Sequence, residues 1–308
     1  MNESLPLLRD TQIYRTADGQ ALSLDVIGAR PGERRPAMLW IHGGGLIFGS
    51  RTTSPRPAFL QLLLERGFVV FSIDHRLAPE TKLPAIFDDV LQAWRWLHGA
   101  GVQHFGADPD RTVIGGASAG AYLALLAANR ATPRPRAVAS FWGYGDILAP
   151  WETQPSPHYL KLEHVSREAA AASLAAPPLQ APTTGSDRST FYLYCRQQGC
   201  WVPEVTGLDI RLDAAELERW CPLRLQGTDS PPVVLVHGQE DTDVPHEQSA
   251  LLAAELARAG VRHRFLSLPG TGHGFAGAHP EEAAAAEREV ANFLLAQVRQ
   301  AVPAGTRV

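Results

Sequence analysis

The stretch that decides the fold is Thr112–Asn129, T-V-I-G-G-A-S-A-G-A-Y-L-A-L-L-A-A-N. Its first part, Thr112–Gly116, is an apolar run with the length of a strand, and its last part, Tyr122–Asn129, has a helical composition. Between them lies the G-x-S-x-G motif of residues 116–120. In a strand–turn–helix setting this motif predicts a nucleophile elbow, which holds its serine at the N-terminus of a helix. We therefore expect Ser118 to be a catalytic nucleophile.

The same alternation of strand and helix extends over most of the chain. Two runs that flank the turn Ala17-Asp18-Gly19 predict an opening β-hairpin, Gln12–Arg15 and Ala21–Ile27. Further runs that are apolar on both faces, as parallel strands covered by helices are, lie at Ala37–His42, Phe68–Asp74, Ala137–Trp142, Val233–His237 and Arg262–Leu268. Amphipathic patterns predict helices at Phe87–His98, Glu247–Ala259 and Glu281–Val298. This order predicts an α/β fold with a mostly parallel sheet of about eight strands.

The segment from Gly145 to Pro222 interrupts this alternation with proline clusters and short helical patterns. Eight of the chain's 13 Trp and Tyr residues lie between Trp142 and Trp220. We expect residues 145–222 to form a cap or lid inserted into a core domain of residues 1–144 and 223–308. Because amphipathic aromatic residues favour apolar surfaces that meet a ligand, we expect Tyr194 and Trp201 to bind substrate. The alternative is that these aromatic residues form the cap's own core.

Three further groups of residues follow predicted strands. His42-Gly43-Gly44-Gly45 ends the strand at Ala37–His42, and consecutive glycines let backbone N–H groups approach a negatively charged oxygen. An acidic loop that contains Glu240, Asp241 and Asp243 follows the strand at Val233–His237. After the last strand, a glycine-rich loop contains His273. Carboxyl ends of strands are where open α/β sheets bind their ligands, so we expect these groups to meet Ser118 there.

Together the motifs resemble the α/β-hydrolases of the hormone-sensitive-lipase-like group. The resemblance rests on H-G-G-G, on G-x-S-x-G, and on Asp74–Glu80 (D-H-R-L-A-P-E) followed by Leu83-Pro84 and Asp88-Asp89. It covers the chain from about Ala37 to Leu295, the cap excluded. It implies an α/β-hydrolase fold, in which Arg76, Glu80 and Asp88 or Asp89 correspond to positions that brace the loops beneath the site.

The resemblance also implies roles for individual residues. Ser118 would be the nucleophile, His273 the general base, and Asp241 its orienting acid, selected from the acidic loop by the family spacing Gly-x-x-Asp. The backbone N–H groups of Gly44, Gly45 and Ala119 would form the oxyanion hole. One departure is that the group usually begins with a long helical segment that forms half of its lid, whereas about ten residues precede the hairpin here. The lid must then come mostly from residues 145–222.

The activity implied is that of a serine carboxylesterase, which hydrolyses small to medium acyl esters through an acyl-enzyme without a metal or cofactor. Other acyl hydrolases on the same triad, namely a lactonase, an amidase or a peptidase, are the first alternative. A peptidase would hold a substrate amine with carboxylates of the cap, for which the candidates are Glu152, Glu163, Glu204 and Asp209. The second alternative is a non-catalytic small-molecule receptor, a class whose members usually lack a triad residue.

Composition limits the partners and the location. The net charge of −4 gives no electrostatic footprint for a nucleic acid, and the 45% of hydrophobic residues and 19% of charged ones are typical of a globular protein. No apolar stretch has the length of a membrane span. The odd number of cysteines (Cys195, Cys200 and Cys221) and the absence of an N-terminal signal pattern predict free thiols and a cytoplasmic protein. The oligomeric state stays open, with a homodimer as one possibility.

Overall fold

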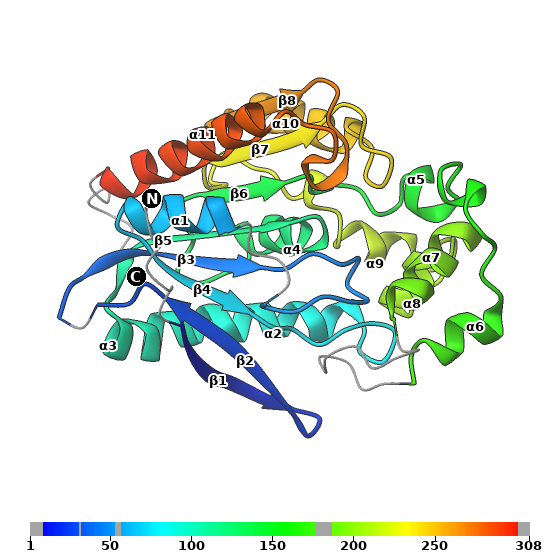
Figure 1. The fold of residues 1–308 in the computed structure, drawn as a ribbon, viewed down its shortest axis with the longest axis horizontal. Helices are drawn as coiled ribbons and strands as arrows, with labels where there is room; N and C mark the ends of the chain where they lie inside the picture. Colours follow the sequence, from blue (N-terminus) through cyan, green and yellow to red (C-terminus); the bar gives the residue numbers. More distant parts are fainter. Residues whose placement is uncertain (1–8, 31, 53–56, 176–186, 301–308) are drawn as a thin grey trace.

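An eight-stranded sheet organises the fold (Figure 1). The computed structural model describes residues 9–30, 32–52, 57–175 and 187–300. The strands are β1 (Arg9–Ala17), β2 (Gln20–Ile27), β3 (Arg35–Ile41), β4 (Val69–Ile73), β5 (Ala107–Ala117), β6 (Val138–Phe141), β7 (Val233–Gly238) and β8 (His263–Leu268). Their order in the sheet is β1-β2-β4-β3-β5-β6-β7-β8. The pairs β1–β2 and β2–β4 are antiparallel and all other pairs are parallel, which confirms the predicted α/β fold.

Helices cover both faces of this sheet. They are α1 (Pro57–Glu65), α2 (Leu83–Trp96), α3 (Val102–Phe105), α4 (Ala119–Ala128), α10 (Glu247–Arg258) and α11 (Pro280–Arg299). Side chains of β3 alternate between the faces, as the period of two in a strand requires. Leu39 and Ile41 belong to the cluster that includes α2, α4 and α10, whereas Met38 and Trp40 belong to the cluster with α1 and α11. Burial on both faces explains the continuous apolar runs of the central strands.

Between β6 and β7 the described chain is helical and contains no strand. Its helices are α5 (Pro150–Thr153), α6 (Arg167–Ala172), α7 (Ser189–Gln198), α8 (Trp201–Thr206) and α9 (Ala214–Glu218), with 3-10 turns at Tyr159–Lys161 and Pro222–Arg224. We call residues 145–222 the cap segment. In Figure 1 its helices lie beyond the carboxyl ends of the parallel strands. Its buried side chains, among them Phe191, Val202 and Leu217, join the same hydrophobic cluster as α2 and α4, so cap segment and sheet share one core.

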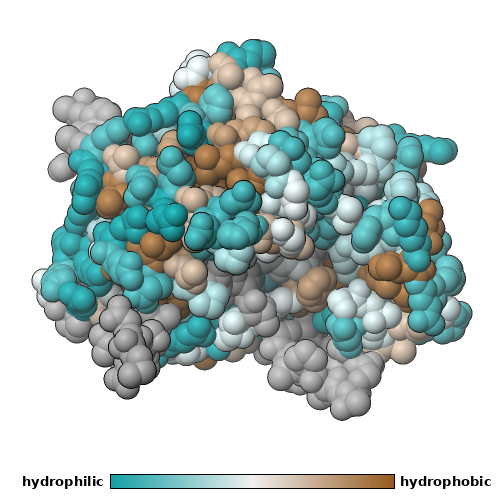
Figure 2. All heavy atoms as spheres, turned by 45° about the horizontal axis from the view of Figure 1, so that its top comes forward, coloured by the Kyte–Doolittle hydropathy of each residue, from teal (hydrophilic) through white to brown (hydrophobic). Residues whose placement is uncertain are grey.

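Hydrophobic and hydrophilic residues alternate on the part of the surface that Figure 2 shows. On the face shown in Figure 2, hydrophobic residues occur in several separate groups among hydrophilic ones. Within the described ranges, no helix has both the length and the apolar character needed to cross a membrane. The large hydrophobic side chains that are exposed come from β1, the cap segment and α10: Ile13, Leu160, Leu162, Leu212 and Leu251. All three cysteines are free, as their odd number predicts.

Candidate active site

Ser118 occupies a strained turn between β5 and α4. Its backbone torsions are φ 53° and ψ −123°, a combination that non-glycine residues rarely adopt and that is often found at functional sites. Its N–H donates to the Phe141 carbonyl of the neighbouring strand at 2.8 Å. A side chain on Gly116 would overlap the backbone of Gly120, and one on Gly120 would overlap the Ile41 carbonyl. The close approach of strand, turn and helix therefore explains both glycines of the G-x-S-x-G motif.

The three glycines after β3 form a loop beside this serine. A Cβ atom on Gly43 would lie 3.3 Å from the Ser118 Cβ, so the loop and the elbow are in contact. Gly44 and Gly45 have φ values of 106° and 59°. Among the described residues, no group accepts a hydrogen bond from the N–H of Gly44, Gly45 or Ala119. Since Ala119 is the first residue of α4, its N–H is one of the donors that a helix leaves unpaired.

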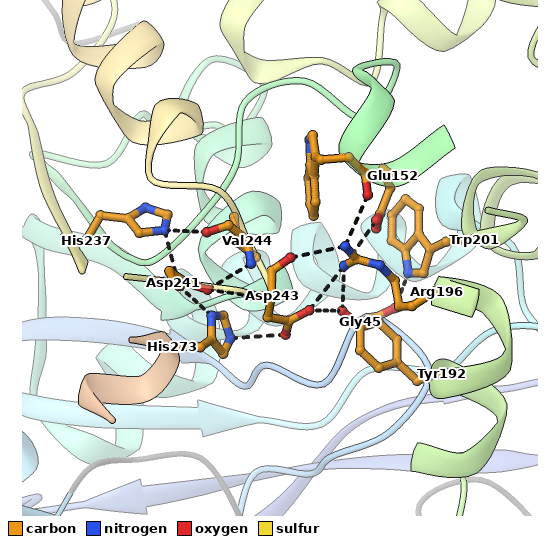
Figure 3. Close-up of polar contacts among 11 residues, drawn as sticks. Gly45, Glu152, Tyr192, Arg196, Trp201, His237, Asp241, Asp243, Val244 and His273 are labelled. Atoms are coloured by element: carbon orange, nitrogen blue, oxygen red, sulfur yellow. Dashed lines mark hydrogen bonds and ion pairs between the residues drawn. The ribbon is translucent and has the colours of Figure 1, made fainter. Parts of the chain in front are cut away.

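Asp241 and His273 meet at the carboxyl ends of β7 and β8 (Figure 3). The Nδ1 atom of His273 lies 2.7 Å from the Oδ2 atom of Asp241. The Oδ1 atom of Asp241 accepts the backbone N–H groups of Asp243 and Val244, each at 2.9 Å. These backbone donors hold the carboxylate in place. The orientation of the imidazole is then determined by its hydrogen bond to Asp241.

The pKa values of this pair are shifted in opposite directions. Burial alone would raise the pKa of Asp241, but its hydrogen bonds with His237 and His273 lower it well below the ordinary value. Burial alone would lower the pKa of His273, but the hydrogen bond to Asp241 and the charges of Asp243 and Asp241 outweigh burial and raise it. Asp241 therefore stays ionised at neutral pH, and His273 is a stronger base than a free histidine.

Ser118 and His273 both contact the end of β6, at Phe141 and at the following residue Trp142, and do not hydrogen-bond each other within the described residues. Phe141 accepts the Ser118 N–H, and the next residue, Trp142, has its ring centre 5.9 Å from that of His273. Within the part of the chain that the structure describes, no hydrogen bond joins the Ser118 hydroxyl to the imidazole. Catalytic hydrogen bonds are often long before substrate binds and tighten in the complex. The structure thus brings Asp241 and His273 into contact and Ser118 into their neighbourhood.

A second carboxylate, Asp243, lies on the opposite side of the imidazole. Its Oδ2 atom is 3.5 Å from the Nε2 atom of His273. Its Oδ1 atom accepts the Tyr192 hydroxyl at 2.6 Å and an Arg196 N–H at 3.1 Å, both from α7 of the cap segment (Figure 3). The sequence pointed to Asp243 only as an alternative acid for the triad. In the structure it connects His273 to the cap segment.

Arg196 is buried at the centre of this connection. It forms ion pairs with Asp243 at 3.1 Å and with Glu152 at 3.3 Å, and the rings of Trp151, Tyr159 and Tyr192 surround its guanidinium at 5.0–5.8 Å. Burial and the charge of Asp243 raise the pKa of Glu152 to about 7, although Arg196 opposes the shift. No motif in the sequence pointed to Arg196. The signal available was that Arg196 is the single charged residue in the aromatic-rich stretch of residues 191–201.

The two residues predicted to bind substrate differ in their exposure. Trp201 is fully buried, and its indole N–H donates to the Gly45 carbonyl at 2.8 Å. This hydrogen bond ties α8 to the glycine loop, and the role of Trp201 in substrate binding stays a prediction. Tyr194 is half-buried and stacks on Phe191 of its own helix, so its role in substrate binding stays a prediction.

Two ion pairs brace the loops beneath the site. Arg76 makes a bidentate pair with Asp89, with both distances at 2.9 Å. Glu80 pairs with Arg188, at the start of α7, at 2.9 and 2.6 Å. Arg188 also donates to the carbonyls of Ile47 and Ala78. The cap helix α7 is thus tied to the core loops at its start, and by Arg196 to the acidic loop near its end.

The chain is similar to several known proteins. The chain matches the family Abhydrolase_3, described as the alpha/beta hydrolase fold, over residues 38–277. It is 28% identical over 270 residues to ethyl acetate hydrolase of Pseudomonas putida, covering 84% of this chain and 73% of the relative. It is also 28% identical over 309 residues to the non-reducing polyketide synthase ausA of Penicillium brasilianum. That match covers 84% of this chain but 12% of the synthase, so the chain spans about an eighth of such relatives.

Solved structures show the same fold. A protein of unknown function from Staphylococcus aureus has a TM-score of 0.75 and 25% identity, with 94% of this chain and 99% of that chain covered. The thermophilic esterase Est2 of Thermogutta terrifontis has a TM-score of 0.67 and 22% identity, with 96% and 95% covered. These matches, with the family match over most of the chain, confirm the resemblance on which the predicted fold rests. The chain belongs to the alpha/beta hydrolase fold family, in its hormone-sensitive-lipase-like group.

Proposed function

We propose that the chain is a serine carboxylesterase that hydrolyses small to medium acyl esters, with Ser118, His273 and Asp241 as its catalytic triad. The observation that carries this proposal is the 2.7 Å contact between His273 Nδ1 and Asp241. His273 also contacts Trp142, the residue after Phe141, whose carbonyl accepts the N–H of the strained Ser118. The relatives named as an ethyl acetate hydrolase and as the esterase LipC of Mycobacterium tuberculosis (27% identical over 276 residues, covering 84% of this chain and 58% of the relative) support ester hydrolysis.

The proposed mechanism follows from the tautomer that Asp241 imposes. Because Nδ1–H donates to Asp241, the Nε2 atom of His273 carries the lone pair that removes the Ser118 proton. The Ser118 oxygen attacks the acyl carbon, and the N–H groups of Gly44, Gly45 and Ala119 stabilise the negatively charged oxygen. Nε2–H then protonates the departing alcohol. Water, activated by the same nitrogen, releases the acid from the acyl-enzyme.

The contacts in the site also affect the alternative functions, namely a peptidase, a non-catalytic receptor, and a lactonase or amidase. Glu152, one of the carboxylates considered for binding a substrate amine, is fully buried and paired with Arg196, so it is not available to a peptidase substrate. A non-catalytic receptor would gain nothing from a strained serine beside an oriented Asp–His pair. A lactonase or amidase would use the same residues and is separated from an esterase by its substrates alone.

The test is a panel of p-nitrophenyl esters from acetate to laurate, with p-nitroacetanilide alongside. We expect turnover of the shorter esters, no measurable hydrolysis of the anilide, and loss of all turnover in Ser118→Ala. Hydrolysis of the anilide at a rate similar to that of the acetate ester would replace the esterase by an amidase. Turnover retained by pure Ser118→Ala would overturn the nucleophile assignment.

A further inference from the structure

The Nε2 side of His273 has a carboxylate that the triad mechanism does not use. In the proposed reaction, this nitrogen returns its proton to the leaving group, so the leaving oxygen must come within hydrogen-bond distance of Nε2. The Oδ2 atom of Asp243 lies 3.5 Å from the same nitrogen. A group attached one or two bonds away from the leaving oxygen is therefore within reach of Asp243.

The carboxylate is anchored so that one oxygen faces this position. Each carboxylate oxygen accepts about two hydrogen bonds. Oδ1 already accepts two, from Tyr192 and Arg196, so a further donor on that side has little room. Oδ2 faces the imidazole, and 17% of the Asp243 side chain is exposed. The Tyr159 hydroxyl also interacts with Asp243, and the Arg196 guanidinium lies 5.3 Å from the centre of the Tyr159 ring.

The resting imidazole does not satisfy Oδ2. When His273 is neutral with its proton on Nδ1, the Nε2 atom is an acceptor and has no hydrogen to offer the carboxylate. The proton reaches Nε2 only during the reaction. In the form that binds substrate, Asp243 thus presents a charged acceptor on the side of the leaving group.

We propose that Asp243 forms a leaving-group subsite that selects esters whose alcohol carries a hydrogen-bond donor, such as a second hydroxyl group near the ester oxygen. The inference rests on the proposed esterase function and deepens it. Tyr192 and Arg196 position the carboxylate before substrate arrives, so little reorganisation opposes binding. A plain alkyl alcohol would partly desolvate this carboxylate and offer it no donor in exchange, which disfavours that substrate.

The test compares two esters of nearly equal size, 2-hydroxyethyl butyrate and propyl butyrate, in which a hydroxyl replaces a methyl group. The ratio of their kcat/KM values is divided by the ratio of their rates of hydroxide-catalysed hydrolysis, which removes the difference in chemical reactivity. We expect the wild-type enzyme to favour the hydroxyethyl ester about 10-fold after this correction. A corrected ratio near one in the wild-type enzyme overturns the proposal without any variant.

Asp243→Asn tests whether this carboxylate causes the preference for the hydroxyethyl ester. Because Tyr192 and Arg196 both donate to the δ1 position, the amide oxygen must take that place, and the NH₂ group then replaces Oδ2. We expect the corrected ratio to fall to about one, since a donor now faces a donor. Any change in the basicity of His273 acts on both esters and cancels in the ratio. A preference that survives this substitution would also overturn the proposal.

Glu152→Gln is the matched control, because it changes the charge on the other side of Arg196 and leaves Asp243 intact. Its ratio should equal that of the wild-type enzyme, and a loss equal to that of Asp243→Asn would assign the effect to the charge of the cluster instead. Failure of the wild-type enzyme on every p-nitrophenyl ester would refute the esterase function itself. Normal turnover of those esters with an unchanged ratio in Asp243→Asn would refute the subsite alone.

Discussion

The two sides of the site are built in different ways. On the core side, backbone geometry positions the groups: the Ser118 elbow, the N–H groups on Asp241 and the glycine loop after β3. On the cap side, pairs of side chains do so, among them Arg196 with Asp243. Backbone geometry follows from the sheet and is shared by any chain with this fold, whereas side-chain pairs belong to this sequence. Changes on the core side should therefore abolish the chemistry, and changes on the cap side should alter its rate or selectivity.

The largest effect should come from Ser118→Ala. Removal of the nucleophile should lower kcat by about five to six orders of magnitude, as for the serine of other triad enzymes. The melting temperature should be unchanged or higher, because the hydroxyl makes no hydrogen bond to the described residues. Ester turnover and thermal unfolding are measured on one preparation. A loss of activity accompanied by unfolding would contradict the prediction that Ser118 contributes to catalysis and not to stability.

The two acids of the acidic loop should differ by orders of magnitude. Asp241→Asn should impose the wrong imidazole tautomer and lower kcat by about 10⁴-fold, the value of the corresponding substitution in a serine protease. Asp243→Asn should lower kcat on a p-nitrophenyl ester by about 10-fold or less, because it leaves the hydrogen bond between His273 and Asp241 intact. Parallel kcat measurements on the two variants check this. If Asp243→Asn lowers kcat more than Asp241→Asn does, then Asp243 and not Asp241 is the triad acid.

A smaller effect is expected where the cap segment holds the glycine loop. Trp201→Phe keeps an aromatic ring but removes the hydrogen bond to Gly45. A loosened oxyanion loop should lower kcat about 10-fold and leave KM nearly unchanged, since the lost contact acts mainly in the transition state. Trp220→Phe is the control, because the buried Trp220 indole N–H has no partner among the described residues. An equal loss of kcat in both variants would mean that the hydrogen bond from Trp201 to Gly45 is not the cause.

The smallest expected effect is a shift in pH dependence. Only neutral His273 accepts the Ser118 proton, so kcat/KM should rise with pH through the pKa of His273. Because that pKa is raised, the midpoint should lie above 6.5. In Asp243→Asn, one of the charges that raise the pKa is absent, so the midpoint should move to lower pH. Profiles between about pH 5 and 9 test the sign. A midpoint that stays in place would show that Asp243 does not act on the base.

The fold was predictable because its signals are local. Apolar runs of strand length and a motif such as G-x-S-x-G depend on neighbouring residues, and the structure has a strand at each predicted run. Boundaries were less accurate: α2 begins at Leu83 instead of Phe87, because Pro84 is compatible with the first turn of a helix. The short helix α1 was not predicted, since its nine residues carry a weak pattern.

The candidate site was predictable only in part, for the same reason. Asp241 and His273 follow strands, so the order of the strands brings them together. Arg196 meets Asp243 and Glu152 through the packing of α7 and α5, and no spacing in the sequence encodes that contact. Trp201 illustrates the same limit, because an aromatic residue in the cap segment can face a substrate or a backbone carbonyl, and composition does not distinguish them.

The attachment of α7 at both ends has a consequence for how the enzyme meets its substrate. Arg188 joins this helix to Glu80 and Arg196 joins it to Asp243. Arg196 and its second partner Glu152 are almost fully buried, and separating a buried charge from its partner costs about 3–5 kcal/mol. We therefore expect α7 to keep its position over the site and not to open as a lid at an oil–water interface. Turnover should follow the concentration of dissolved ester along a simple saturation curve. It should show no sudden increase when the ester passes its solubility limit and forms droplets.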